Sequence, residues 1–268
     1  MISRYCTTIV ALFISLLTYS QSEFRIISLT PSITDHIYSM GSQDQLIACS
    51  SYCLQAVDDG KIVVGSTLNV NVEKIYSLKP DLILTMGLTK QHDIETMRNL
   101  GLNIKVLKTP KSFDEICEQT IEIGALIQRQ KEAKVIVDQA KAKVAALSNK
   151  KSAQKSVFFQ IGANPIYAVL ENTFMNDYIT LCQGENIAKG LKIGNITRES
   201  VLRKNPEVVV IASMGAFGKK EKETWESYTE MKAARDKKIF IIESDVCCSP
   251  TPDNFVKALE DVYHFIND

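Results

Sequence analysis

A long stretch without proline, from Ser112 to about Asn149, most constrains what this chain can fold into. Its only glycine is Gly124. Apolar residues recur through it at the three- and four-residue spacing of an amphipathic helix: Ile116, Ile123, Leu126, Ile127, Val135, Val137, Val144 and Leu147. We therefore predict a continuous or once-broken helix. At about 1.5 Å per residue it could reach about 50 Å, which is enough to span two lobes.

Short β-rich runs alternate with helical segments on both sides of this stretch, and that pattern is typical of parallel βα units. The expected strands before it are "FRIISLT", "QLIACSS", "LILTMG" and "NIKVLKT". Those after it are "VFFQIG", "EVVVIAS" and "IFIIES". We predict an α/β protein of two lobes, each with a mainly parallel central sheet flanked by helices. One long backbone helix is expected to join the lobes, with a ligand cleft between them.

The predicted divisions are 1–22 for a signal peptide, 23–127 for the N-terminal lobe, 128–150 for the linking helix and 151–268 for the C-terminal lobe. The signal peptide is indicated by a positive charge at Arg4, an apolar run, and small polar residues suited to cleavage before residue 23. The apolar run is shorter than the roughly 20 residues of a membrane-spanning helix. We therefore expect a periplasmic protein, exported by a cleaved signal peptide.

Composition narrows the function classes. Lys plus Arg and Asp plus Glu both total 31, and no basic stripe is present, so we expect no nucleic-acid partner. The 45% hydrophobic content is enough for a substantial core. The sequence has no G-x-S-x-G elbow, no H-E-x-x-H and no phosphate-binding glycine loop. A binding protein is therefore favoured over an enzyme, and we assign no catalytic residues.

Two stretches share one arrangement: "EKIYSLKPDLIL" at 73–84 and "ESVLRKNPEVVV" at 199–210. In each, a glutamate opens the stretch, a proline follows seven residues later, and an acid precedes an aliphatic run. Proline ends the helix because it disfavours helical geometry at the residue before it. An ordinary connection from helix to strand also explains part of this similarity. The stretches therefore indicate one equivalent helix-to-strand step in each lobe.

The chain resembles, over nearly its full length, the periplasmic substrate-binding proteins of ABC importers for vitamin B12, iron siderophores and haem. The resemblance is carried by the order and spacing of "RIISLTPSITDHIYSMG", "SSYC", "VEKIYSLKPDLIL", the long helix, "LCQGENIA", "TRESVLRKNPEVVVI" and "ESDVCCSPTPD". The chain is most similar to the cobalamin-binding members. Those relatives line the cleft with several tryptophans, whereas Trp225 is the only tryptophan here.

This resemblance implies a non-enzymatic protein that captures a metal chelate and delivers it to the membrane subunits of an inner-membrane ABC importer. The chelate would be a corrinoid, a ferric siderophore or haem, bound as cargo, so no resident cofactor is expected. We expect a monomer. A binder of metal ions, an adhesin-like protein, or an exported enzyme on the same scaffold are the alternatives.

The resemblance also gives the repeated glutamates a role. In the family, one glutamate at this position in each lobe docks onto arginines of the two membrane subunits. Glu73 and Glu199 match that position. The alternative is that each carboxylate only interacts with the positive end of its helix, which contributes about 0.3 to 1 kcal/mol.

The ligand site is expected outside the carboxyl ends of the strands, where α/β sheets bind their ligands. A flat, rigid chelate needs apolar or aromatic faces with a few polar anchors. The predicted ligand-binding residues are Tyr52, Ser66, Met86, Tyr167, Met214, Phe217 and Asp245. Ordinary packing is the alternative, since Met and Tyr often fill irregular space. The three histidines lie in helical segments or at their starts, so we predict no resident metal site.

Six cysteines follow the expected signal peptide: Cys49, Cys53, Cys117, Cys182, Cys247 and Cys248. A structural disulfide between the lobes, a thiolate metal site and a redox pair are three possible roles for those in the cleft loops. Three residues separate Cys49 from Cys53, so a Cys-x-x-Cys redox motif fits poorly. Metal-binding thiolates would need protection from oxidation. We therefore expect Cys247 or Cys248 to pair with Cys53 or Cys49 in an oxidising compartment.

Overall fold

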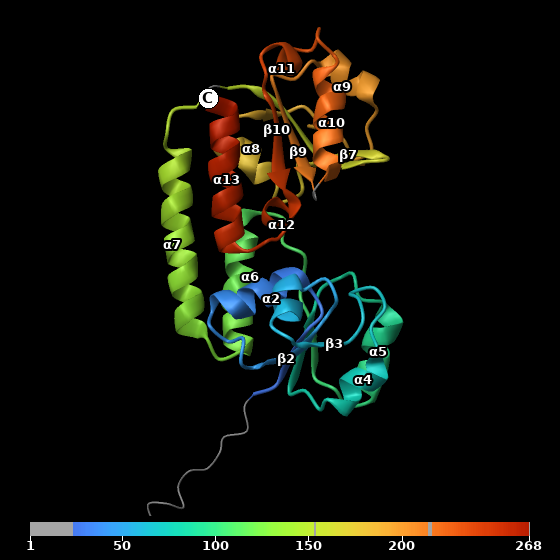
Figure 1. The fold of residues 1–268 in the computed structure, drawn as a ribbon. Helices are drawn as coiled ribbons and strands as arrows, with labels where there is room; N and C mark the ends of the chain where they lie inside the picture. Colours follow the sequence, from blue (N-terminus) through green and yellow to red (C-terminus); the bar gives the residue numbers. More distant parts are fainter. Residues whose placement is uncertain (1–23, 153, 214–215, 268) are drawn as a thin grey trace, which may run out of the picture.

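Two lobes, stacked end to end, make up the described part of this chain (Figure 1). The structure is a computed structural model and describes residues 24–152, 154–213 and 216–267. The predicted signal peptide at 1–22 and the predicted ligand contact Met214 lie outside these residues.

The first lobe is built on five parallel strands in the order β3-β2-β1-β4-β5. The strands are β1 (Ile26–Ser28), β2 (Leu46–Cys49), β3 (Ile62–Val63), β4 (Leu82–Thr85) and β5 (Ile104–Val106). The helices are α2 (Pro31–Ser39), α3 (Leu54–Asp58), α4 (Val72–Ser77) and α5 (Gln91–Asn99). Every residue of β1 and β4 is buried. Their near-continuous apolar runs follow from this, because helices cover both faces of a parallel sheet.

The second lobe has a five-stranded sheet in the order β10-β9-β6-β7, with β8 also pairing with β6. The strands are β6 (Ser156–Ala163), β7 (Ile166–Ala168), β8 (Glu185–Asn186), β9 (Val208–Ser213) and β10 (Ile239–Glu243). Only the β6–β7 pair is antiparallel among the described ladders. The helices are α8 (Asn176–Leu181), α9 (Arg198–Lys204), α10 (Ala216–Glu226), α11 (Lys232–Arg235), α12 (Ser244–Cys247) and α13 (Pro252–Asn267). The prediction of mainly parallel sheets flanked by helices is confirmed.

The proline-free stretch forms a helical hairpin of α6 (Phe113–Leu126) and α7 (Gln130–Ser148). The once-broken alternative is therefore the one that the chain adopts. The helix breaks at Gln128, which has a left-handed φ of 61°. Gly124 lets the two helices approach closely, since a Cβ there would lie 2.5 Å from the Cβ of Ala133. The expected reach of about 50 Å is wrong because the break reverses the chain, leaving α7 about 28 Å long.

Both helices of this hairpin contribute to the cores of both lobes. In α6, Phe113 and Ile116 belong to the core of the second lobe, whereas Ile123 belongs to that of the first. In α7 the order is reversed: Ala133 packs in the first lobe and Val144 in the second. Figure 1 shows α7 running alongside both lobes, next to α13. The connector is therefore packed along its length and is not a free hinge.

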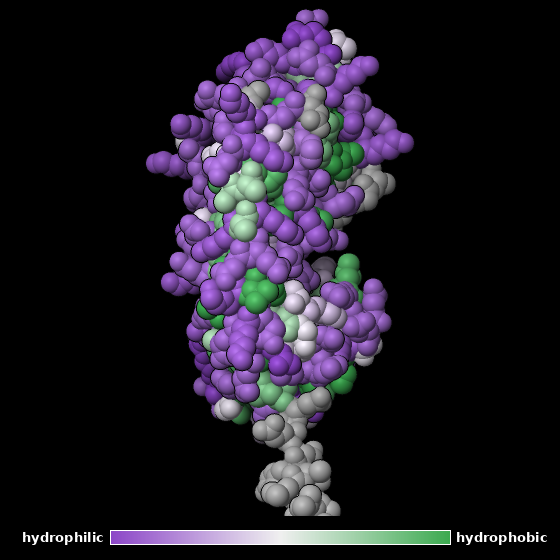
Figure 2. All heavy atoms as spheres, turned by 90° about the vertical axis from the view of Figure 1, so that its left-hand side faces the viewer, coloured by the Kyte–Doolittle hydropathy of each residue, from purple (hydrophilic) through white to green (hydrophobic). Residues whose placement is uncertain are grey.

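The outer face of this connector is largely polar. Figure 2, which views the molecule from the side that α7 occupies in Figure 1, shows a mostly hydrophilic surface with small separate apolar areas. This agrees with α7 burying one stripe, formed by Ala133, Val137, Ala140, Val144 and Leu147. Among the described residues, no helix combines the length and apolarity needed to cross a membrane.

Candidate ligand-binding site

A cavity of about 1110 Å³ lies between the two lobes. Its wall in the first lobe comes from the loops after β1, β2 and β4 and from the cavity-facing side of α2. Its wall in the second lobe comes from β6, from the segment 244–251 after β10, and from the start of α13. Most of the wall thus follows the carboxyl ends of parallel strands, where the topology predicts a ligand. The volume is at the upper limit of ordinary small-molecule pockets, roughly 300 to 1,000 Å³, so a bulky ligand fits.

Three of the predicted contact residues, Tyr52, Met86 and Asp245, lie in this one cavity wall. Tyr52 is 62% exposed, which leaves its ring free to cover a ligand. Met86 is buried, and its sulfur accepts a hydrogen bond from the Ser32 hydroxyl at 3.6 Å. The structure thus places the Tyr52 ring and the buried Met86 thioether of the first lobe in the same cavity wall as the Asp245 carboxylate of the second lobe.

The other predicted contacts that the structure describes, Ser66, Tyr167 and Phe217, do not line this cavity. The Ser66 hydroxyl accepts a hydrogen bond from the Asn69 backbone N–H at 3.1 Å, so it stabilises a local turn. Tyr167 and Phe217 are 42% and 45% exposed, on β7 and α10 respectively. Their part in ligand binding stays a prediction, because strand order alone does not say which exposed rings reach the cavity.

Of the acidic side chains in the wall, sequence reasoning predicted Asp245 and missed Asp35, Asp59 and Asp253. The lining residues include a single cation, Lys257, and four carboxylates: Asp35, Asp59, Asp245 and Asp253. Asp35 comes from α2, while Asp253 and Lys257 come from the first turns of α13. A signal for these residues was present in the sequence. Pro31 and Asp35, and likewise Asp253 and Lys257, are four residues apart, which places each pair on one helix face.

Hydrogen bonds hold two of these carboxylates. Asp35 accepts from the Ser249 hydroxyl at 2.7 Å, which joins α2 of the first lobe to the 244–251 segment of the second. Burial raises the pKa of the Asp35 carboxyl above its ordinary value, although the Ser249 hydrogen bond opposes the shift. Asp59 accepts from the Tyr38 hydroxyl at 2.6 Å. Asp245 is exposed, so an acceptor there is open to a ligand.

One hydroxyl of the wall has no partner. Thr30, at the N-cap of α2, is 8% exposed, and its Oγ1 makes no hydrogen bond. Buried polar groups are normally satisfied, because an unpaired one costs about 1 to 3 kcal/mol.

The expected disulfide between the lobes is not formed, since all six described cysteines are free. Cys53 is buried in the core of the first lobe, with its sulfur 3.3 Å from the Ser50 hydroxyl. Cys247 is buried in the core of the second lobe. The sulfurs of Cys53 and Cys247 therefore lie in two separate hydrophobic cores. That each cysteine follows a strand in the sequence does not indicate which core buries it. Cys248 is exposed and lines the cavity, with its sulfur 3.7 Å from that of Cys247.

Hydrogen bonding separates the acidities of these neighbouring thiols. The hydrogen bond between the Cys247 and Cys248 sulfurs lowers the pKa of the Cys248 thiol. The same hydrogen bond, together with burial, raises the pKa of Cys247. Within the described part of the chain, no group of three or more His, Cys, Asp or Glu side chains is arranged to hold a bare metal ion.

A family model described as "Periplasmic binding protein" matches residues 26–246, which include both sheets and most of the cavity wall. The chain belongs to the periplasmic binding protein family. A vitamin B12-binding protein of Yersinia pseudotuberculosis is 32% identical over 210 residues, which are 76% of this chain and 75% of the relative. The resemblance seen in the sequence is confirmed by these two matches.

Solved structures support the same fold. The periplasmic vitamin B12-binding protein of Vibrio cholerae is 25% identical and has a TM-score of 0.74, covering 91% of this chain and 96% of its own. The periplasmic haem-binding protein of the same organism has a TM-score of 0.81 at 15% identity, covering 91% and 98%. At that identity the haem-binding structure shows the fold alone. The relatives named here are binding proteins.

The two repeated glutamates of this periplasmic binding protein occupy equivalent places. Glu73 lies in the first turn of α4, whose N-cap Asn71 accepts from the Lys74 backbone N–H at 2.9 Å. Glu199 lies in the first turn of α9, whose N-cap Thr197 accepts from the Ser200 N–H at 3.2 Å. Both glutamates are exposed. In Figure 1, α4 and α9 lie on different lobes, on the side of the molecule away from α7.

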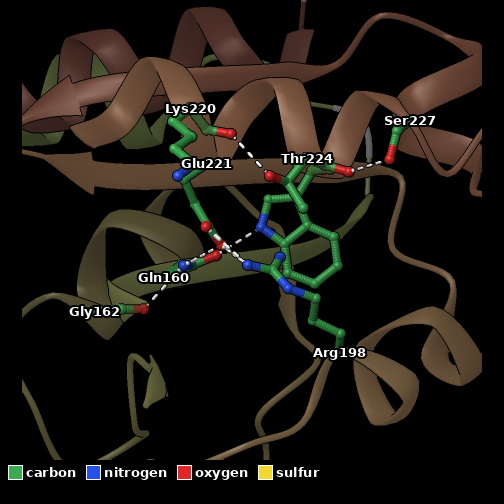
Figure 3. A network of polar contacts seen from close by, with 8 residues as sticks. Gln160, Gly162, Arg198, Lys220, Glu221, Thr224 and Ser227 are labelled. Atoms are coloured by element: carbon green, nitrogen blue, oxygen red, sulfur yellow. Dashed lines mark hydrogen bonds and ion pairs between the residues drawn. The ribbon is translucent and has the colours of Figure 1, made fainter. Parts of the chain in front are cut away.

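The helix that carries Glu199 is fixed by a buried polar network (Figure 3). Arg198, the first residue of α9, donates to both carboxylate oxygens of Glu221 at 2.7 and 2.8 Å. Gln160 of β6 also donates to Glu221, at 2.7 Å, and accepts from the Trp225 indole at 2.7 Å. The Arg198 guanidinium lies 4.7 Å from the centre of the Trp225 ring. Trp225 is therefore structural here and does not line the cavity.

Proposed function

We propose that this chain is an exported binding protein that captures a metal chelate between its lobes and delivers it to an inner-membrane ABC importer. The observation that carries the proposal is the cavity of about 1110 Å³ at the strand ends of both lobes. Family membership and the vitamin B12-binding relative support it. The three candidate cargoes are a corrinoid, a ferric siderophore and haem.

The charge of the cavity favours a corrinoid among these cargoes. Four carboxylates and one lysine line the wall. Haem carries two propionates and many siderophores are polyanionic, so either would face like charge in a partly desolvated site. The rim of a corrinoid carries amide groups, whose N–H donors match carboxylate acceptors such as that of Asp245. Lysine or arginine clusters, which recognise carboxylates in pairs, are absent from the lining residues.

Direct binding measurements test this proposal. The purified chain is titrated with aquocobalamin, hemin and a ferric catecholate siderophore, and binding is followed by absorbance and calorimetry. We expect the tightest binding for aquocobalamin and one site per chain. An Asp245→Asn, Asp253→Asn double variant removes two charges from the cavity wall. It should narrow the difference between the affinities for aquocobalamin and for hemin. Binding of none of the three, with a tightly held bare metal ion instead, would contradict the proposal.

A further inference from the structure

One residue of the cavity wall lies in an irregular part of its strand. In the ladder between β6 and β7, Gln160 pairs with Ala168. Gly162 pairs with Tyr167, the neighbour of Ala168, so Ile161 is an extra residue in a β-bulge. Bulges redirect side chains, and Ile161 is 41% exposed and lines the cavity between the lobes. A ligand that fills the cavity therefore meets this bulge.

The side chain of Gln160 holds the backbone of the bulge. Its Nε2 donates to the Gly162 carbonyl at 2.9 Å, across the intervening Ile161. The same Nε2 donates to Glu221 at 2.7 Å, and its Oε1 accepts from the Trp225 indole at 2.7 Å (Figure 3). The Gln160 amide is fully buried and uses both its donor nitrogen and its acceptor oxygen, so these contacts fix its orientation.

The same network reaches the helix that carries Glu199. Both carboxylate oxygens of Glu221 accept from Nη2 of Arg198, at 2.7 and 2.8 Å. Arg198 is the first residue of α9 and directly precedes Glu199. A continuous chain of hydrogen bonds therefore runs from the cavity wall, through Gln160 and Glu221, to the first turn of α9.

Backbone pairing joins the same two regions. The Ala168 N–H of β7 donates to the Gly194 carbonyl at 2.8 Å, and the Ile196 N–H donates to the Ile166 carbonyl of β7 at 3.1 Å. The next residue, Thr197, is the N-cap of α9. The β6–β7 hairpin and the start of α9 are therefore one packed unit, which contains both the bulge in the wall and the exposed glutamate of the second lobe.

We propose that Gln160 is a positioning residue that couples the cavity wall at Ile161 to α9, so that a bound ligand orders the helix that presents Glu199. The inference rests on the proposed function, with docking through Glu199, and deepens it, because it lets the importer distinguish a loaded protein from an empty one. Chains of packed side chains and hydrogen bonds carry coupling of this kind. A ligand packed on the bulge restrains the carbonyl to which Gln160 donates. The buried Glu221 has little water to replace a displaced partner, so the restraint reaches α9.

Hydrogen exchange followed by mass spectrometry tests this coupling, with aquocobalamin and hemin as probes. In the wild-type chain, the amides of α9 should exchange more slowly at saturating probe, by about fivefold or more, the lower end of the range for coupled sites. Gln160→Met keeps the length of the side chain and removes its hydrogen bonds, whereas Ile161→Ala removes the side chain in the wall. In both variants, saturated with probe, α9 should exchange at the same rate as without probe. A purely structural role would change the exchange rate with and without probe alike.

Two matched variants complete the design. Leu88→Ala removes an exposed aliphatic side chain from the wall of the first lobe. Lys222→Ala removes a partly exposed side chain next to Glu221 on α10, outside the network. Both variants should keep the slower exchange of α9 that the bound probe causes in the wild type.

Equal exchange of α9 with and without bound probe in the wild-type chain overturns the inference and leaves the proposed function intact. A slowing that survives in Ile161→Ala or in Gln160→Met, or one that is lost in Leu88→Ala, overturns it too. If Gln160→Met does not fold, Ile161→Ala decides the question, since its side chain is partly exposed. If neither probe binds the wild-type chain, the assignment of these two cargoes fails and the inference fails with it.

Discussion

At the scale of single residues, two buried ionisable side chains, His36 and Glu221, are accommodated in different ways. His36 in α2 is fully buried, and burial lowers the pKa of its imidazole to about 4. Glu221 in α10 is 5% exposed and forms an ion pair with Arg198 at 2.7 Å. A neutral group and a paired charge are the two ways in which an interior tolerates ionisable side chains. Each makes a distinct prediction.

His36 should make the protein sensitive to mild acid. Its pKa is about 6.5 in the unfolded chain and about 4 in the folded one. The stability that it contributes is therefore fully present above pH 6.5 and is lost as the pH falls from 6.5 to 4, by about 3 kcal/mol. Urea unfolding at several pH values should show this slope in the wild type and lose it in His36→Leu. The exposed His92→Leu should keep the slope.

Arg198 should matter more for stability than an ordinary surface cation. Arg198→Ala leaves the buried Glu221 carboxylate without the Nη2 donor that contacts both of its oxygens, which should lower the free energy of unfolding by about 3 kcal/mol. The matched control is Lys222→Ala, which removes an exposed ion pair with Glu226 on the same helix and should cost under about 1 kcal/mol. Equal losses in the two variants, measured by chemical denaturation, would show that Glu221 finds other partners.

At the scale of secondary-structure elements, the α6–α7 hairpin and the two short helices α4 and α9 have separate tasks. The hairpin sets how the lobes are joined, because each of its helices packs in both cores. The short helices place one exposed glutamate on each lobe. The first task depends on close packing and the second on surface charge, so they respond to different substitutions.

Gly124→Ala tests the close approach in the hairpin. The added Cβ would meet the Ala133 Cβ at 2.5 Å and the Arg129 carbonyl oxygen at 3.0 Å. Overpacking of this kind costs about 1 to 3 kcal/mol, and the better helix propensity of alanine recovers up to about 1 kcal/mol. We expect a net loss of about 1 kcal/mol in thermal or chemical unfolding. Gly87→Ala, whose Cβ meets nothing within 4 Å, should stay within about 0.5 kcal/mol of the wild type.

Charge reversal at Glu73 and Glu199 tests docking to the importer. Charges at a polar interface chiefly set orientation and encounter rate. Both residues are exposed and neither lines the cavity, so ligand affinity should remain near the wild-type value. Uptake should fall in Glu73→Arg and in Glu199→Arg, and most in the double variant. Glu132→Arg is the control, since it lies in the first turn of α7 on the opposite side of the molecule. Unchanged uptake in the double variant would leave only the helix-end role.

At the scale of the whole molecule, the lobes are held by more than the connector. Asp35 and Ser249 form a hydrogen bond across the cavity region. The start of α6 packs on the second lobe, where Phe113 lies 4.5 Å from Phe255 between ring centres and its N–H donates to Asp177. Two helices packed in both cores resist bending more than extended strands would.

Ligand binding should therefore move the lobes only slightly. Small-angle X-ray scattering of the wild-type chain with and without aquocobalamin should give nearly equal radii of gyration, because large closure would require the α6–α7 hairpin to leave one of its two cores. Asp35→Asn is the control, because the asparagine side chain retains an acceptor for the Ser249 hydroxyl across the cavity. A marked compaction on ligand addition would contradict a rigid connector.

Local pattern was enough to predict most of the architecture. The spacing of Ile116, Ile123, Val137 and Val144 specified helices, and the short aliphatic runs specified strands, because burial on one face or on both leaves a periodic record in the sequence. The order of those elements then placed a site at the strand ends, and Tyr52, Met86 and Asp245 do line one cavity there. Family membership followed from the same segments in order.

Tertiary packing decided the rest. The left-handed residue Gln128 reverses the chain between α6 and α7. The side of α2 that faces the second lobe brings Asp35 to the cavity. Cys53 and Cys247 lie apart because each is buried in the core of a different lobe. Each depends on the angle at which two elements meet, which involves residues far apart in the chain. A sequence read locally records which side chains are buried. Only the assembled lobes determine which of them meet, because contact depends on the packing of surfaces and not on position along the chain.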